Sequence, residues 1–106
     1  MRRVIYRKQY DLAERKAEWM QEDGRVISNR VKELLIDSAV RFSKRYQQGI
    51  EIAEEGEEMS IDLYLTDHFF MGDGKAELTR LFIWANRVDL SLGSEDVLIN
   101  FYFKII

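Results

Sequence analysis

The stretch GIEIAEEGEEMSIDLYL, residues 49–65, decides the fold expected for this chain, because apolar and polar side chains alternate on both sides of a central glycine. Alternation with a period of two is typical of a β-strand that buries one face. Glu55-Gly56 suits a two-residue hairpin turn, in which glycine supplies the positive φ angle. The stretch therefore predicts two antiparallel strands, with Ile52 opposite Met59.

Two further turns extend the predicted sheet towards the C-terminus. Asp73-Gly74 and Gly93-Ser94 also suit two-residue hairpin loops, so residues 49–106 are predicted to form a four-stranded antiparallel meander. The registers set by the three turns bring alternate, mainly apolar side chains of all four strands onto one face. Because a slip of one residue would reverse that face, the agreement of the registers supports the predicted pairing.

The strand between these last two turns, residues 75–92, is far longer than the usual length of about five or six residues. We expect it to be strongly twisted, or to be interrupted by a bulge near Asn86-Arg87, where polar residues break the alternation. In this arrangement Leu81 and Ile83 point outwards, away from the apolar face.

The preceding residues, about 10–48, have the pattern of two helices. Asp11 and Glu14 have the spacing of a capping box, and a breaker-free run continues to Gly24, so we expect a first helix there. A second helix, ending near Gly49, is predicted from side chains that recur at spacings of three and four: Ile27, Val31, Leu34, Leu35, Ser38, Phe42 and Tyr46. The predicted fold is α+β, with two N-terminal helices packed on one face of a four-stranded antiparallel β-meander.

Length and composition restrict the class of protein. The 106 residues are 46% hydrophobic and 33% charged, which fits a single globular domain over residues 1–106. The chain has no cysteine, so disulfides, thiolate catalysis and cysteine-based metal sites are excluded. Its longest apolar run, Leu81–Ala85, is far short of the roughly 20 residues of a membrane span, and no signal peptide follows the basic start. We expect a soluble cytoplasmic protein without a cofactor.

Charge is divided unevenly along the chain. Residues 1–48 contain 12 Lys and Arg against 7 Asp and Glu, whereas residues 49–106 contain 4 against 12. Such a split is compatible with a basic surface for nucleic acid or an acidic partner, or with head-to-tail self-association. The charge split is also explained by basic side chains at a helix C-terminus and a solvated acidic loop, which is the interpretation we favour. The candidate basic patch is Arg41, Lys44 and Arg45.

The outer sheet face, opposite the predicted helices, is expected to carry an apolar patch that monomeric proteins seldom leave exposed. The predicted interface consists of Tyr64, Leu81, Ile83, Tyr102 and Ile106. Residues 1–10 could fold back over it. Otherwise a second copy, another protein or a small apolar ligand would cover it.

The single histidine, His68, is the main candidate for chemistry. Its neighbour Asp67 is predicted to point to the opposite face of the strand, so the two cannot form a catalytic dyad. Asp62 and Tyr64 share the face of His68 and could take part in proton transfer with it. A metal site is not expected, because the acidic segment 54–58 lacks the ligand spacing of a calcium loop.

These observations favour a small non-catalytic interaction or assembly protein that self-associates or binds a protein partner through the outer sheet face. The alternative is a small enzyme or ligand-binding domain with a pocket around His68, Asp62 and Tyr64. A second alternative is nucleic-acid binding through the basic helical half, for which the sequence offers no recognisable motif. Domains of this fold class serve many functions, so the fold alone does not choose between them.

Overall fold

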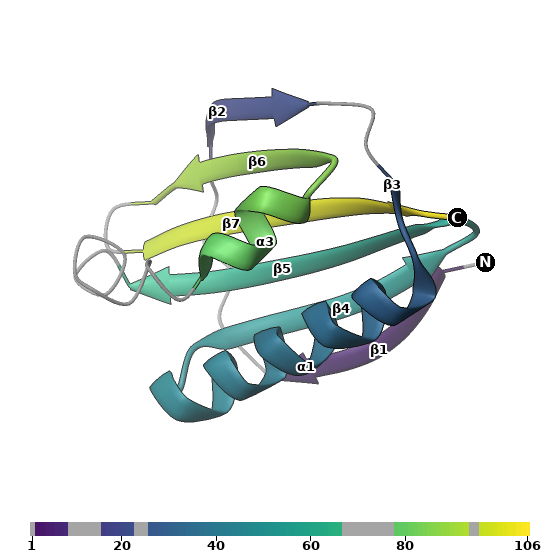
Figure 1. Cartoon of the computed structure of the whole chain (residues 1–106). Helices are drawn as coiled ribbons and strands as arrows, with labels where there is room; N and C mark the ends of the chain where they lie inside the picture. Colours follow the sequence, from purple (N-terminus) through teal and green to yellow (C-terminus); the bar gives the residue numbers. More distant parts are fainter. Residues whose placement is uncertain (1, 9–15, 23–25, 67–77, 94–95) are drawn as a thin grey trace.

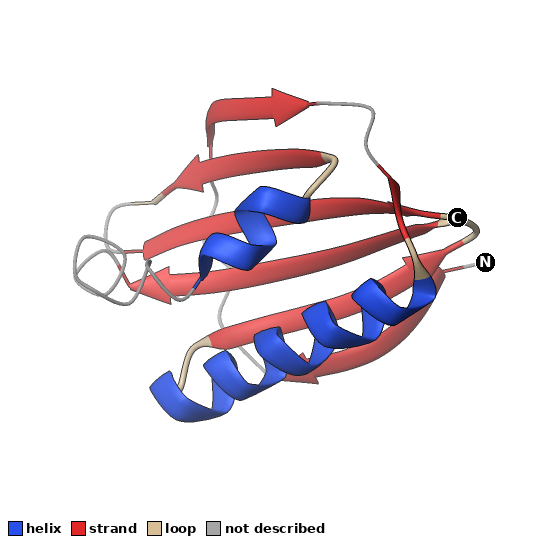
Figure 2. Ribbon diagram, in the orientation of Figure 1, coloured by secondary structure: helices blue, strands red, loops and turns tan. Residues whose placement is uncertain are grey.

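The computed structural model describes residues 2–8, 16–22, 26–66, 78–93 and 96–106. Its elements are β1 (Arg2–Lys8), β2 (Lys16–Glu22), β3 (Val26–Ile27), α1 (Asn29–Tyr46), β4 (Gly49–Glu55), β5 (Glu58–Thr66), α3 (Thr79–Trp84), β6 (Arg87–Leu92) and β7 (Asp96–Ile105). Six strands lie in the order β1-β4-β5-β7-β6-β2, and every neighbouring pair is antiparallel. The short β3 pairs in parallel with the end of β7. The two helices of the described residues, α1 and α3, lie on the same face of the sheet (Figures 1 and 2).

Helix α1 confirms the second predicted helix. The side chain of Ser28 accepts a hydrogen bond from the backbone N–H of Val31, which satisfies one of the unpaired donors of the first turn. Leu35, Ala39 and Phe42 form its buried stripe against the sheet. The helix ends at Tyr46, a few residues before Gly49, so its C-terminus lies beside the start of β4.

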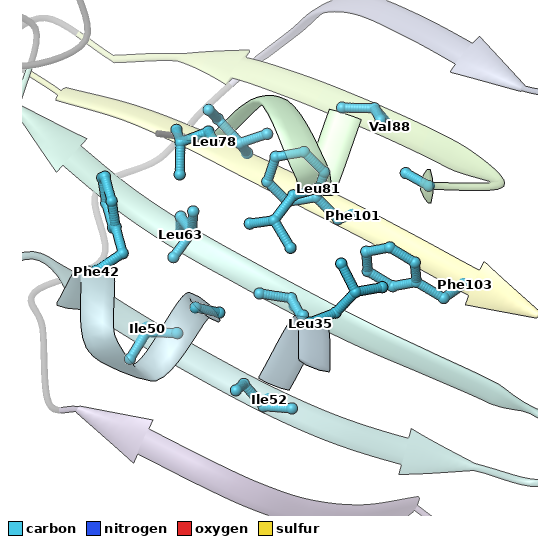
Figure 3. Packing of buried hydrophobic residues seen from close by; sticks show 14 of the residues in the cluster. Leu35, Phe42, Ile50, Ile52, Leu63, Leu78, Leu81, Val88, Phe101 and Phe103 are labelled. Atoms are coloured by element: carbon cyan, nitrogen blue, oxygen red, sulfur yellow. The ribbon is translucent and has the colours of Figure 1, made fainter. Parts of the chain in front are cut away.

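The core lies between the sheet and the two helices. Alternate residues of β4, β5 and β7 point into it, and Leu35 and Phe42 of α1 and Leu81 of α3 pack against them from the other side (Figure 3). Ring contacts continue this packing, since Phe82 of α3 meets the ring of Phe101 edge to face with 5.0 Å between the ring centres. The apolar face predicted from alternation is thus the helix-covered face.

The predicted arrangement of two N-terminal helices on a four-stranded meander is wrong. Residues 16–22, assigned to the first helix, form the edge strand β2, which pairs with β6. The residues of the proposed capping box, Asp11 and Glu14, lie outside the described residues. Pairing with a strand more than 60 residues away along the chain has overridden the local helical pattern, as tertiary context often does.

The long strand predicted over residues 75–92 is also wrong. Within it, Thr79–Trp84 form the short helix α3, and only Arg87–Leu92 form a strand. The expected interruption near Asn86 is therefore a change from helix to strand. Because α3 replaces the strand that was expected to follow β5, the neighbour of β5 is β7, which follows it by some 30 residues in the sequence.

The predicted registers differ from the observed ones in the same way at two hairpins. Met59 lies opposite Glu54 rather than Ile52, and Ile99 lies opposite Leu90 rather than Val88. Each change moves the pairing by two residues, so every side chain stays on its predicted face. Gly56, with a φ angle of 60°, supplies the left-handed conformation of the first turn, and Asp73-Gly74 lies outside the described residues.

The N-terminal residues 2–8 form strand β1 at the sheet edge and do not fold over the outer sheet face. They pair with β4, and a bulge between Val4 and Tyr6 shifts the register. Neither described helix has the length and apolar character that a membrane span requires.

Candidate functional site

The outer sheet face, on the side of the sheet away from α1 and α3, is strongly polar at its centre. Four side chains form one row across neighbouring strands, because their Cα atoms are paired: Glu51 of β4, Asp62 of β5, Asn100 of β7 and Asp89 of β6. The adjacent row, in the same strand order, consists of Ala53, Ser60, Tyr102 and Arg87. Three carboxylates in one row would repel one another unless each had a partner.

Glu51 and Asp89 have cationic partners. The side chain of Glu51 is only 9% exposed and forms an ion pair with Arg2 of β1. Asp89 accepts two hydrogen bonds from Arg87, with N–O distances of 2.8 and 3.2 Å. The guanidinium group of Arg87 also lies over the ring of Tyr102, 4.9 Å from its centre. These contacts fix the orientation of the Tyr102 ring from one side.

Asp62 is held differently, because its hydrogen-bond partner is the neutral side chain of Asn100. Burial raises the pKa of the Asp62 carboxyl group above its ordinary value of 3.8, and the charge of Glu51 adds to this effect. The hydrogen bond from Asn100 and the charge of Arg2 act in the opposite direction and lower the pKa. Asp62 is thus a half-buried carboxylate that forms no ion pair with a cation among the described residues.

Burial, followed by the negative charges of Asp89 and Asp62, raises the pKa of the Tyr102 hydroxyl. The positive charge of Arg87 lowers it, and the hydrogen bond to Asp89 raises it further. The hydroxyl is therefore a proton donor to Asp89 at neutral pH and does not serve as a base.

A hollow of about 240 Å³ opens beside these groups, at the end of the sheet near the β4–β5 turn. Its floor is the cross-strand pair Ala53 and Ser60, whose small side chains leave room above the sheet. Arg2 borders it on the β1 side and Tyr102 on the β7 side. The other lining residues are Glu54, Glu55, Glu58, Met59 and Asp62. With four carboxylates and one arginine around it, the hollow favours a positively charged group.

The pKa of Asp62 has a consequence for stability. Between pH 3.8 and the raised native pKa, the folded chain binds the Asp62 proton more tightly than the unfolded chain does. The contribution of this group to the unfolding free energy is therefore full below pH 3.8 and is lost as the pH rises through the native pKa. We expect the unfolding free energy of Asp62→Asn, relative to the unmodified chain, to increase over this range.

Urea unfolding from about pH 3 to about pH 7 measures this difference. Ser60→Ala is the matched control, because it changes a neighbouring side chain of the outer sheet face without removing a titrating group. The difference in unfolding free energy between Ser60→Ala and the unmodified chain should not vary with pH. A difference for Asp62→Asn that is equally constant would contradict the upward direction of the pKa shift.

The five residues of the predicted interface are not brought together. Tyr64 and Tyr102 lie half-buried on the outer sheet face, as predicted, separated by the row that contains Asp62. Leu81 and Ile83 belong to α3 on the other face, where Leu81 is 2% exposed in the core and Ile83 is 53% exposed. Ile106 is exposed beyond the end of β7. Their contiguity depended on a strand over residues 75–92, which the helix replaces.

Of the proposed acid–base group, only Asp62 and Tyr64 lie within the described residues, on the same face of β5 as predicted; His68 lies outside them. Within the described part of the chain, no three His, Asp or Glu side chains group closely enough to hold a metal ion. Among the described residues, Asp62 therefore contributes to a recess lined by charged side chains.

The predicted basic patch forms a second recess. Arg41, Lys44 and Arg45, together with Ser38 and Phe42, line a hollow of about 520 Å³ on α1. Arg41 also forms an exposed ion pair with Asp37, at 2.9 Å, and the guanidinium group of Arg45 lies over the ring of Tyr46. The prediction that these three residues share one surface is compatible with this arrangement.

Sequence reasoning missed Arg2, which borders the outer hollow, and its ion-pair partner Glu51, because it did not predict the β1–β4 pairing. The signal was present: Val4, Ile5 and Tyr6 are residue types that favour strands, and Glu51 interrupts the apolar residues of β4 on the outer side. Comparison of the chain with protein-family models, curated proteins and solved structures gave no match. The geometry of the two hollows is therefore the basis for assigning a function.

Proposed function

We propose that the protein is a small non-catalytic interaction module that binds a protein partner through its outer sheet face, by accepting a lysine or arginine side chain of that partner. The observation that carries this proposal is the acidic hollow above Ala53 and Ser60, bordered by Tyr102 and Asp62. A cation that enters this hollow can form an ion pair with Asp62, a half-buried carboxylate whose hydrogen-bond partner is the neutral amide of Asn100.

The volume of the hollow indicates that it would hold a side chain and not a larger ligand. Pockets that hold small-molecule ligands and cofactors usually measure about 300–1,000 Å³. At about 240 Å³ this hollow is smaller. It therefore suits one side chain of a partner whose remaining contacts spread over the sheet.

The chemistry of the lining selects a cationic donor. Asp62, Glu55 and Glu58 present acceptor oxygens, and hydrogen bonds between charged partners are worth about 1.5–3 kcal/mol, more than those between neutral groups. The ring of Tyr102 gives an apolar wall for the aliphatic stem of lysine or arginine. The positive charge of Arg2 repels an entering cation only weakly, because it is paired with Glu51.

This proposal is tested with N-acetyl-arginine amide as the probe and N-acetyl-citrulline amide as its uncharged match. We expect the arginine probe to cause saturable shifts of backbone amide NMR signals at Ser60, Asp62 and Tyr102, with a dissociation constant in the millimolar range, about −4 kcal/mol. The citrulline probe should bind about tenfold more weakly, since it lacks the charge.

Asp62→Asn should weaken the arginine probe about tenfold, because it removes the carboxylate but keeps the shape. The control is Glu33→Gln, which removes an exposed carboxylate of α1, on the other side of the sheet, and should leave the affinity unchanged. Equal binding of both probes, or an affinity that Asp62→Asn leaves unchanged, would refute a cation-binding role for the hollow.

A further inference from the structure

The folded chain separates its charges to opposite ends. Helix α1, with 18 residues, is about 27 Å long, and β4 follows it directly and runs back beside it. The basic C-terminus of α1 therefore lies at one end of the molecule and the β4–β5 turn at the other, along a longest dimension of 37 Å (Figure 1).

The basic end is concave. The hollow on α1 has Phe42, 4% exposed, as its apolar floor and three cationic side chains around it: Arg41, Lys44 and Arg45. Its volume of about 520 Å³ lies within the range of about 300–1,000 Å³ in which pockets hold ligands, so it has room for more than one side chain. The C-terminus of a helix contributes roughly half a negative charge, which three cations exceed.

The acidic end projects. Gly56 turns the chain at an exposed tip, and the neighbouring carboxylates of Glu55, Glu57 and Glu58 are exposed. Within the described part of the chain, these three glutamates form no ion pair; Glu54, in contrast, is bound by Arg3 and Lys32. Two cationic residues are paired with this tip in the sheet: the Cα of Lys104 faces that of Glu58, and the Cα of Arg2 faces that of Glu55. The guanidinium group of Arg2 forms its ion pair with Glu51, so among the described residues the tip keeps a net negative charge.

We propose that copies of this chain assemble head to tail, with the acidic tip of one copy seated in the basic hollow of the next. The two surfaces are complementary in sign and in shape, and they lie too far apart to meet within one copy. Such a contact is heterologous, so it builds rings or filaments and does not stop at a symmetric dimer. The tip adjoins the outer hollow, because Glu55 and Glu58 also line that hollow, whereas Glu57 does not and therefore distinguishes the two sites.

The first test is the mass in solution by light scattering, from about 10 µM to about 1 mM protein. Contacts between exposed charges are individually weak, so the average mass should rise gradually over this range at low salt. The rise should disappear in about 1 M salt, where the Debye length falls to about 3 Å.

Two charge reversals locate the contact. Lys44→Glu in the hollow and Glu57→Lys at the tip should each raise the protein concentration needed for association by about tenfold or more. Arg80→Glu and Glu33→Lys are matched controls of the same charge change at other exposed positions, and they should leave it nearly unchanged. All four side chains are exposed, so the circular dichroism spectra should stay the same.

A mixture of the two reversed variants gives the sharpest result. Lys44→Glu keeps a functional tip and Glu57→Lys keeps a functional hollow, and the two reversed charges attract each other, so an equal mixture should associate at a lower protein concentration than either variant alone. A mass of one chain at every concentration in low salt would overturn the proposal, as would a mixture that associates no more than either variant alone.

Two further outcomes would also overturn it. One is an assembly that persists in high salt and is lost on Ser60→Trp, because that assembly would use the outer sheet face. The other is a chain that stays single but binds a single-stranded oligonucleotide, with an affinity that falls with salt and with Lys44→Glu, which would assign the basic hollow to nucleic acid. Loss of self-association with intact arginine-probe binding would leave the proposed function standing.

Discussion

Leu81→Asp is expected to unfold the chain or to reduce its unfolding free energy by at least about 4 kcal/mol, whereas Ile83→Asp should cost about 1 kcal/mol or less. Leu81 is 2% exposed and packs into the core from α3, so the substitution removes apolar contacts and buries an ionised carboxylate. Ile83 is 53% exposed on the same helix. A domain of this size is stable by only roughly 5–15 kcal/mol, so the first change is severe.

The pair of variants also distinguishes the helix from the strand that the sequence predicted. In a strand, residues 81 and 83 point to the same face, so an aspartate at either position would meet the same surroundings. In α3 they lie about 200° apart around the helix axis. Urea unfolding followed by circular dichroism measures both losses, and equal losses for the two variants would contradict α3.

The sequence was most informative where one local pattern determined one element. The stripe through Leu35 and Phe42 predicted α1, and the alternation along residues 49–65 predicted β4, β5 and the face that each side chain occupies. Each of the two observed turn centres lies one residue further along the chain than predicted. The residue opposite a given residue therefore differs by two positions from the predicted one, and every side chain keeps its predicted face. Asp62 and Tyr64 were therefore placed correctly on the outer sheet face.

The errors arose where local preference and tertiary pairing disagree. Residues 16–22 contain strong helix formers, yet they form β2 because β6 offers an unpaired edge. The run LFIWA, residues 81–85, is apolar throughout, and such a short run does not distinguish a strand from a buried helix. Four of its residues form part of α3, so Leu81 lies in the core and is not part of the predicted interface.

The candidate site could be predicted only in part, for the same reason. The carboxylates of the polar row follow from alternation, but the hollow beside them depends on which strands are neighbours. Ala53 and Ser60 form its floor only because β4 pairs with β5 in the observed register, and Arg2 borders it only because β1 pairs with β4. Strand order is a long-range property, and the alternation within each strand does not encode it.

Phe101→Ala is expected to lower the unfolding free energy by about 3–5 kcal/mol, the usual loss for a fully buried phenylalanine. Phe101 is 0% exposed at the centre of β7, and its Cα partners are Ile61 and Val88 on the two neighbouring strands. Leu98→Ala, a half-buried position on the outer face of the same strand, should cost about 1 kcal/mol. Urea unfolding with an unchanged denaturant slope measures the difference.

A double-mutant cycle with Phe82→Ala tests the packing of α3 on this strand. The edge-to-face contact between the rings of Phe82 and Phe101 should give a coupling energy of about 0.5–1.5 kcal/mol. In the meander predicted from sequence, Phe82 instead faces Ile105, four residues or about 13 Å along the strand from Phe101, so the two substitutions would add without coupling. Additive losses would therefore place α3 elsewhere, and a coupling in the expected range requires the helix to lie over β7.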